Sequence, residues 1–136
     1  MTTCLLSFLS GLLFINVTEA QTTWTGAIDQ NWHNAANWTN GLPAPGNDAF
    51  IPDVMNDPVI TSSTTFNYEV TITGTLHTQV KVEILMILSI QDNGTLIVDD
   101  SLLCSGEFTN QGVVEYGLII IEDQGIFINF GIILGG

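Results

Sequence analysis

Positive charge is almost absent from this sequence. Its 136 residues contain 14 acidic side chains against a single lysine, Lys81, with no arginine, and the formal net charge is −13. A surface of this kind repels the phosphates of nucleic acids and of anionic lipids. We therefore expect neither as a partner, and the composition fits a soluble extracellular protein or one from a salty environment.

Cysteine is also scarce, which limits covalent cross-linking. The two cysteines are Cys4 and Cys104, and Cys4 lies in a segment that we predict is removed. Disulfides within the chain are then excluded as the source of its stability. Cys104 follows two leucines and precedes a turn, which favours a buried small hydrophobe; a reactive thiol or a bond between chains is the alternative.

Long apolar runs are missing, and two short ones are present. Residues 5–15 have the length of a signal-peptide core and are too short to span a bilayer, and small residues follow up to Ala20. We predict a signal peptide over residues 1–20, although its start lacks the usual basic residue. Residues 82–90 predict one or two buried strands. No membrane span is expected after cleavage, and the expected location is extracellular or on the outer cell surface.

A regular glycine period is what the sequence does contain. Gly74, Gly94, Gly112 and Gly131 follow one another at intervals of 20, 18 and 19 residues. Their neighbours recur too, because residues 106–117 match residues 125–136 at five positions in twelve. A fixed period in this range is typical of a solenoid.

The segments between these glycines are short and rich in Val, Ile, Thr and Phe, which indicates strands. Stacking such coils about 4.8 Å apart pairs each strand with those above and below it. We predict an all-β fold, a right-handed parallel β-helix with about four coils of 18–20 residues over residues 61–136. A β-sandwich with evenly spaced turns is the alternative.

Matching the coils by their glycines predicts two stacked rows of side chains. One row is apolar and interior, and the other carries amide or carboxylate groups at the following turn, where they can bond from coil to coil. The glycine two residues later is expected to supply unusual backbone angles. The interior row is Ile90, Phe108 and Phe127, and the polar row is Asp92, Asn110 and Asn129.

Residues 21–60 differ in texture, because they hold all three tryptophans and all four prolines. Frequent prolines exclude long helices and central strands. We predict a loop-rich cap that closes the first coil, whose open end would otherwise expose core side chains and unpaired strand groups. The alternative is that Trp24, Trp32 and Trp38 form an exposed platform for glycan rings.

The same segment carries a recognisable string of motifs. They are Trp24-Thr-Gly26, Asn31-Trp32, Ala35-Ala36-Asn37-Trp38, Pro43, Asp48, Ile51-Pro52 and Pro58-Val59-Ile60. The string resembles the opening of large secreted and surface proteins of the Bacteroidetes. The resemblance implies an adhesin-like repeat protein with β-helical coils, of a group that often carries a C-terminal signal for type IX secretion. No such sorting domain is present, and we expect a repeat region cut short at residue 136, with its last coil open to end-to-end contact.

Catalytic constellations are not evident. Pectate-lyase-like enzymes, which share the predicted fold, use a basic residue beside a calcium-bound carboxylate, and Lys81 is the only one available. The adjacent acids at residues 99–100 and 122–123 point to opposite faces if they lie in strands, so paired-carboxylate hydrolysis is not expected. His33 and His77 have no partner at the spacing of zinc ligands.

Calcium is the one metal with a candidate loop, although no cofactor is expected. Asp48, Asp53, Asn56 and Asp57 form an oxygen-rich stretch, and calcium binds six to eight oxygens from flexible loops. No EF-hand pattern accompanies them.

These features together predict a non-catalytic secreted or cell-surface module, a structural stalk or adhesin-like scaffold whose partners are extracellular glycans or surface proteins. Two alternatives are the N-terminal part of a polysaccharide-degrading β-helix enzyme and a glycan-binding module.

Overall fold

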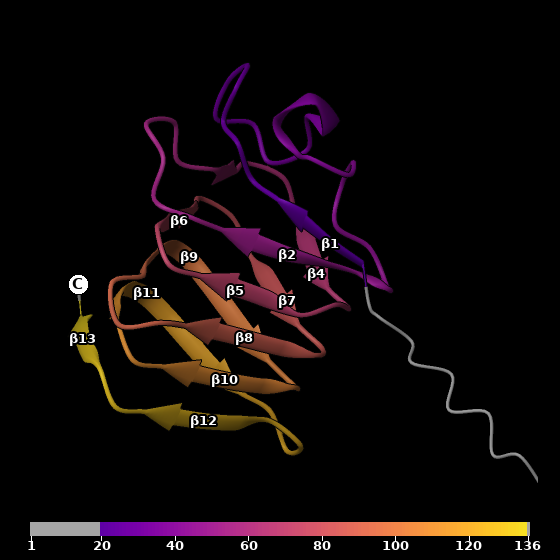
Figure 1. Ribbon diagram of the computed structural model, residues 1–136. Coiled ribbons are helices and arrows are strands. Elements are labelled where there is room, and N and C mark those ends of the chain that lie inside the picture. Colours follow the sequence, from indigo (N-terminus) through magenta and orange to yellow (C-terminus); the bar gives the residue numbers. More distant parts are fainter. Residues whose placement is uncertain (1–19, 136) are drawn as a thin grey trace, which may run out of the picture.

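The computed structural model describes residues 20–135, which form an all-β solenoid (Figure 1). The described range contains no α-helix, and its one helical turn is the 3-10 turn η1 (Ala35–Asn37). The strands are β1 (Ala20–Thr23), β2 (Asn47–Ile51), β3 (Val59–Ile60), β4 (Thr64–Phe66), β5 (Val70–Ile72), β6 (Thr75–Thr78), β7 (Val82–Ile84), β8 (Ile87–Ile90), β9 (Thr95–Cys104), β10 (Glu107–Asn110), β11 (Val113–Ile121), β12 (Ile126–Asn129) and β13 (Ile132–Gly135).

The strands stack into two parallel sheets. One sheet has the order β1-β2-β5-β8-β10-β12, and the other has the order β13-β11-β9-β6-β3, with β7 joining β4 to β9. Every pairing between these strands is parallel. The molecule is therefore a parallel β-solenoid of about five turns, as predicted, and not a β-sandwich.

Stacked strands begin before residue 61. β2 pairs with β5, and β3 pairs with β6, so residues 47–60 already contribute to a coil. Pro52 and Pro58 lie between these two strands, and the glycine period does not extend to them. This first coil can be recognised only from its strand pairing and not from the glycine period. About four turns were therefore predicted, whereas about five are present.

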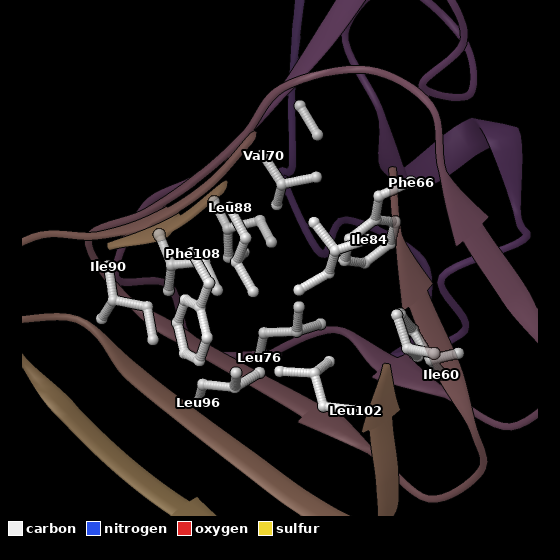
Figure 2. Packing of buried hydrophobic residues seen from close by; sticks show 14 of the residues in the cluster. Ile60, Phe66, Val70, Leu76, Ile84, Leu88, Ile90, Leu96, Leu102 and Phe108 are labelled. Atoms are coloured by element: carbon white, nitrogen blue, oxygen red, sulfur yellow. The ribbon is translucent and has the colours of Figure 1, made fainter. Parts of the chain in front are cut away.

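Alternation along each strand sends every second side chain into the core. In β6, for example, Leu76 and Thr78 are buried, whereas Thr75 and His77 are only partly covered. Figure 2 shows aliphatic and aromatic side chains from both sheets meeting inside the coils. Full burial of one such side chain contributes about 1.5–3 kcal/mol. Cys104 is buried among them as predicted, and desolvation raises the pKa of its thiol despite weak bonds to two carbonyls.

Two members of the predicted interior row lie in register. Phe108 stands opposite Phe127, with ring centroids 4.7 Å apart. Two members of the polar row are also in register, because Asn110 Nδ2 donates to Asn129 Oδ1 at 2.7 Å. Stacked aromatic and amide rows therefore exist in the last two coils.

The other two assignments are wrong. Leu88 lies opposite Phe108, and Ile90 lies opposite Asn110, while Asp92 is exposed in a turn. The cause is corner length: residues 91–94 separate β8 from β9, but only residues 111–112 separate β10 from β11. Matching the glycines therefore shifts the strand by two residues. Such a shift preserves which side chains point inward, so the incorrect register still placed an apolar residue in the core.

The corner glycines serve close packing and not unusual backbone angles, which corrects the prediction. In the described residues, positive φ occurs only at Gly26, Gly41 and Gly46. A Cβ on Gly112 would lie 2.1 Å from the carbonyl oxygen of Gly94, which is the corner of the coil before it. Each corner therefore lacks a side chain because the preceding coil occupies that space.

Asn110 provides a test of the amide row. Its side chain is fully buried, and its Oδ1 atom has no partner among the described residues. The same column continues as Ile90 and Ile72, so leucine fits the apolar surroundings. We expect Asn110→Leu to leave stability unchanged or raise it by up to about 1 kcal/mol.

The matched variant Asn110→Ala leaves a cavity and is expected to lower the free energy of unfolding by about 1–2 kcal/mol. Urea denaturation of both variants measures the difference. A loss for leucine as large as that for alanine would show that the amide row stabilises the solenoid.

Candidate functional site

The three tryptophans form a buried cluster at the N-terminal end of the solenoid. Trp24, Trp32 and Trp38 are 0%, 2% and 5% exposed. Trp38 packs edge to face against both others, with centroid distances of 5.2 Å to Trp24 and 4.8 Å to Trp32, and Trp32 continues onto Phe66 of β4. An exposed glycan platform made of these rings is therefore excluded. The cluster covers the first coil, in the position predicted for a cap.

The polar edges of two indoles are bonded to main-chain carbonyls. Trp24 Nε1 donates to Asn56 O at 2.7 Å, and Trp38 Nε1 donates to Trp32 O at 2.9 Å. A buried indole N–H without a partner would cost stability. The first bond fixes Trp24 to the loop between β2 and β3, and the second fixes Trp38 to the main chain of Trp32. Neither of these two indoles keeps a free donor for a ligand.

Asn37 organises the loop that carries the tryptophans, a role that the sequence did not reveal. It is fully buried, its Oδ1 accepts from the backbone N–H groups of Ile28 and Asp29, and its Nδ2 donates to Asp29 Oδ1 at 2.6 Å. Hydrogen bonds from Asn37, Asn34 and the Asn31 backbone lower the pKa of Asp29. The recurring Asn-Trp pair was the available signal, since in both copies the asparagine holds the loop and the tryptophan enters the core.

A shallow groove runs beside this cap. Its floor includes the edges of Trp32 and Tyr68, and its wall includes Leu42 and Pro43. The opposite wall, residues 63–65, also borders a second hollow that contains Lys81 and Glu83. Burial raises the pKa of the Tyr68 hydroxyl well above its ordinary value, so this group is a neutral hydrogen-bonding group at physiological pH.

His33 stands on the rim of the groove between two hydroxyl groups. Thr64 Oγ1 donates to Ser62 O at 2.8 Å, so its contact with His33 Nε2 at 3.2 Å has the ring as donor. His33 Nδ1 then accepts from Ser62 Oγ at 3.3 Å. Within residues 20–135, no carboxylate is hydrogen-bonded to this ring. The rim can donate and accept hydrogen bonds, but it does not form a triad.

The oxygen-rich loop is not assembled around one point. Asp48 Oδ1 accepts from the Glu69 backbone N–H at 2.9 Å, at the other end of β2 from Asp53 and Asp57. Asn56 is committed to Gly26 and Trp24. Within residues 20–135, no group of three or more His, Cys, Asp or Glu side chains is placed to hold a metal ion.

Asp57 is destabilised in its charged form. Desolvation, and secondarily the Asp53 charge, raise its pKa, and its Oδ1 has no hydrogen-bond partner within residues 20–135. Between the ordinary carboxyl pKa and this raised pKa, the folded state binds more protons than the unfolded state, so stability falls as pH rises through that window. We expect Asp57→Asn to raise the free energy of unfolding at pH 7 but not below about pH 3.

Urea denaturation at the two pH values measures this effect. Asp53→Asn is the matched control and should give a smaller gain, since it removes only the second cause. An Asp57→Asn gain that is equal at both pH values would contradict the argument.

The remaining titratable residues lie on the flanks of the coils. His77 Nε2 and Asp99 Oδ2 are 2.8 Å apart, one coil above the other, while His33 belongs to the cap. The structure therefore does not bring the two histidines together. No helix within the described range is long and apolar enough to cross a membrane.

Stacked parallel coils and a buried aromatic cluster near the N-terminus define a parallel β-solenoid. Residues 23–119 match the model of a family described as a domain of unknown function, DUF8693, and the chain belongs to that family. The match spans the cap and the coils as far as β11, so both are parts of one domain type. No curated protein and no solved structure matches the chain.

Proposed function

We propose that this protein is a non-catalytic secreted or cell-surface module that serves as a structural stalk or adhesin-like scaffold. The observation that carries the proposal is the continuous core, in which columns such as Leu76, Leu96 and Val114 stack from coil to coil. Such a core gives a rod in which each coil contacts only its neighbours. Thirteen of the fourteen acidic residues lie after the predicted signal peptide, and they keep such a rod soluble and favour an environment outside the cell.

The proposed location extends the resemblance to Bacteroidetes surface proteins. The predicted signal peptide lies outside the described residues except for Ala20, the first residue of β1. Cleavage after Ala20 would leave Gln21, Thr22 and Thr23 paired with β2. Removal of the signal is therefore compatible with the first sheet.

Export is tested with the full chain, tagged at its C-terminus and expressed in its source organism. We expect the tag in the medium or accessible to protease on intact cells, and a mature N-terminus at Gln21 by mass spectrometry. The matched control is Leu13→Arg, which interrupts the apolar core of the signal and should retain the protein inside. A wild-type chain that stays in the cytoplasm with its first 20 residues intact would overturn the proposal.

A glycan-binding role has one observation in its favour, the groove beside the cap. The His33 ring, the hydroxyls of residues 63–65 and the Tyr68 edge line it, and sugars are bound by hydrogen-bonding groups next to aromatic surface. We expect a ligand from a glycan panel to shift NMR signals of these residues, and His33→Ala to weaken binding at least about fivefold. Thr109→Ala, on a distant coil, is the control. No response across the panel would remove this role.

A further inference from the structure

The last coil exposes an apolar end without charge. β12 and β13 each have a neighbour on one side only among the described residues. Edge strands usually carry charges or prolines that prevent further pairing, yet residues 125–135 contain neither. The large apolar side chains exposed on or near this end are Leu118, Ile120, Ile121, Ile126, Ile128, Phe130, Ile132 and Leu134.

We propose that this end is a docking surface for one more solenoid coil, supplied by an extended segment that adds parallel strands to β12 and β13. The end also prescribes the sequence of that segment. The inference rests on the fold and holds whether or not the proposed location is correct.

The amide row gives the end a direction. Asn110 Nδ2 donates forward to Asn129 Oδ1 at 2.7 Å and to Ile132 O at 3.3 Å, both in the next coil. The described residues include no coil beyond Asn129, and its Nδ2 donates at 3.3 Å to Gly131 O, only two residues away. A segment with an acceptor above Asn129 repeats the pattern of the coil before it.

The glycine corner adds a second requirement. A Cβ on Gly112 would lie 2.1 Å from Gly94 O, and one on Gly131 would lie 2.2 Å from Gly112 O. The same stacking places the corner of an added coil over Gly131 O, where only glycine fits.

Apolar side chains complete the pattern. Phe127 and Ile133 are inward apolar residues of the last two strands, and with Tyr116, Ile119 and Ile121 they line a hollow that opens at this end. The docking segment therefore reads apolar-x-Asn-x-Gly-x-apolar, with an aspartate as a second choice of acceptor. Residues 108–114 of the chain itself have this form, Phe-Thr-Asn-Gln-Gly-Val-Val.

A second copy of the protein fits this end less well. The tryptophan cluster covers the opposite end, so a copy would have to meet β12 and β13 with its own β12 and β13. Its Asn129 would then present the same amide group, which donates to Gly131 O of its own turn, and its strands would not continue the parallel stacking. The direction of the amide row and the corner carbonyl favour a coil over a copy.

The test uses the full chain and a synthetic peptide that copies its residues 105–117. We expect one peptide to bind per chain. The amides of Phe127 and Asn129 should then exchange hydrogen more slowly, because they point away from β10 and toward the added strand. A peptide carrying Gly112→Val is the matched control and should bind at least about tenfold more weakly. Asn129→Leu in the protein should also weaken binding of the unmodified peptide.

The other outcomes contradict the proposal. Equal binding of both peptides would show a non-specific apolar surface, and binding of neither would show that the end does not accept a coil. A dimer in sedimentation equilibrium that the peptide fails to dissociate would identify a second copy as the occupant.

Discussion

Replacing Gly112 with alanine is expected to lower the free energy of unfolding by about 2–3 kcal/mol. The added Cβ would lie 2.1 Å from Gly94 O and 2.6 Å from Gln91 O. Both contacts are main-chain atoms, so no side-chain rotation relieves them. The coils on either side of the corner must separate, which strains hydrogen bonds such as that from Val113 N to Gly94 O at 2.9 Å.

Gly135→Ala is the matched control for this variant. Its Cβ would meet only Tyr116 Oη, at 3.8 Å, which is an ordinary contact. Urea denaturation should therefore show a loss for Gly112→Ala and almost none for Gly135→Ala. Equal stability of the two variants would mean that the corners are more loosely stacked than described.

Truncating Trp32 to alanine is expected to cost about 3–5 kcal/mol. The ring is 2% exposed and contacts both Trp38 and Phe66, so its removal leaves a cavity between the cap and β4. Because the first coil would lose its cover, we expect residues 20–66 to exchange amide hydrogens faster than the later coils.

Phe130→Ala is the control for loss of an aromatic ring. Phe130 is 76% exposed, so this variant should change stability by less than about 0.5 kcal/mol. Thermal unfolding and acrylamide quenching of tryptophan emission measure the two effects. Efficient quenching in the wild type, or a stable Trp32→Ala variant, would contradict a buried cap.

The repeat made the architecture predictable, because its period is a direct consequence of stacked coils. It did not give the register. Similar motifs at Gly94 and Gly112 conceal corners of four and two residues, and only pairing of the strands shows which residues face each other. Glycine is required at both corners because the preceding coil leaves no room for a side chain. It therefore marks where a corner lies but not how many residues the corner contains.

Composition alone did not show whether the tryptophans are buried in a cap or exposed on the surface. Aromatic residues beside turns suit both a cap and a sugar platform. The partner of Trp24 is the main-chain oxygen of Asn56, 32 residues away, and a backbone acceptor has no signature in sequence. Asn37 was missed for a similar reason, since its partners are mainly backbone groups of residues 28–31.

Oxidation of paired cysteines tests the central claim, which is the parallel register of the coils. Ser89 and Thr109 lie opposite each other with side chains on the outer face, a separation that a disulfide spans. Gln91 also points outward but is two residues further along, about 8 Å from Thr109 by strand geometry. We expect Ser89→Cys/Thr109→Cys to oxidise readily while folded and Gln91→Cys/Thr109→Cys to stay reduced, with Cys104 buried in both. Ready oxidation of the Gln91 pair, with the Ser89 pair reduced, would contradict this register.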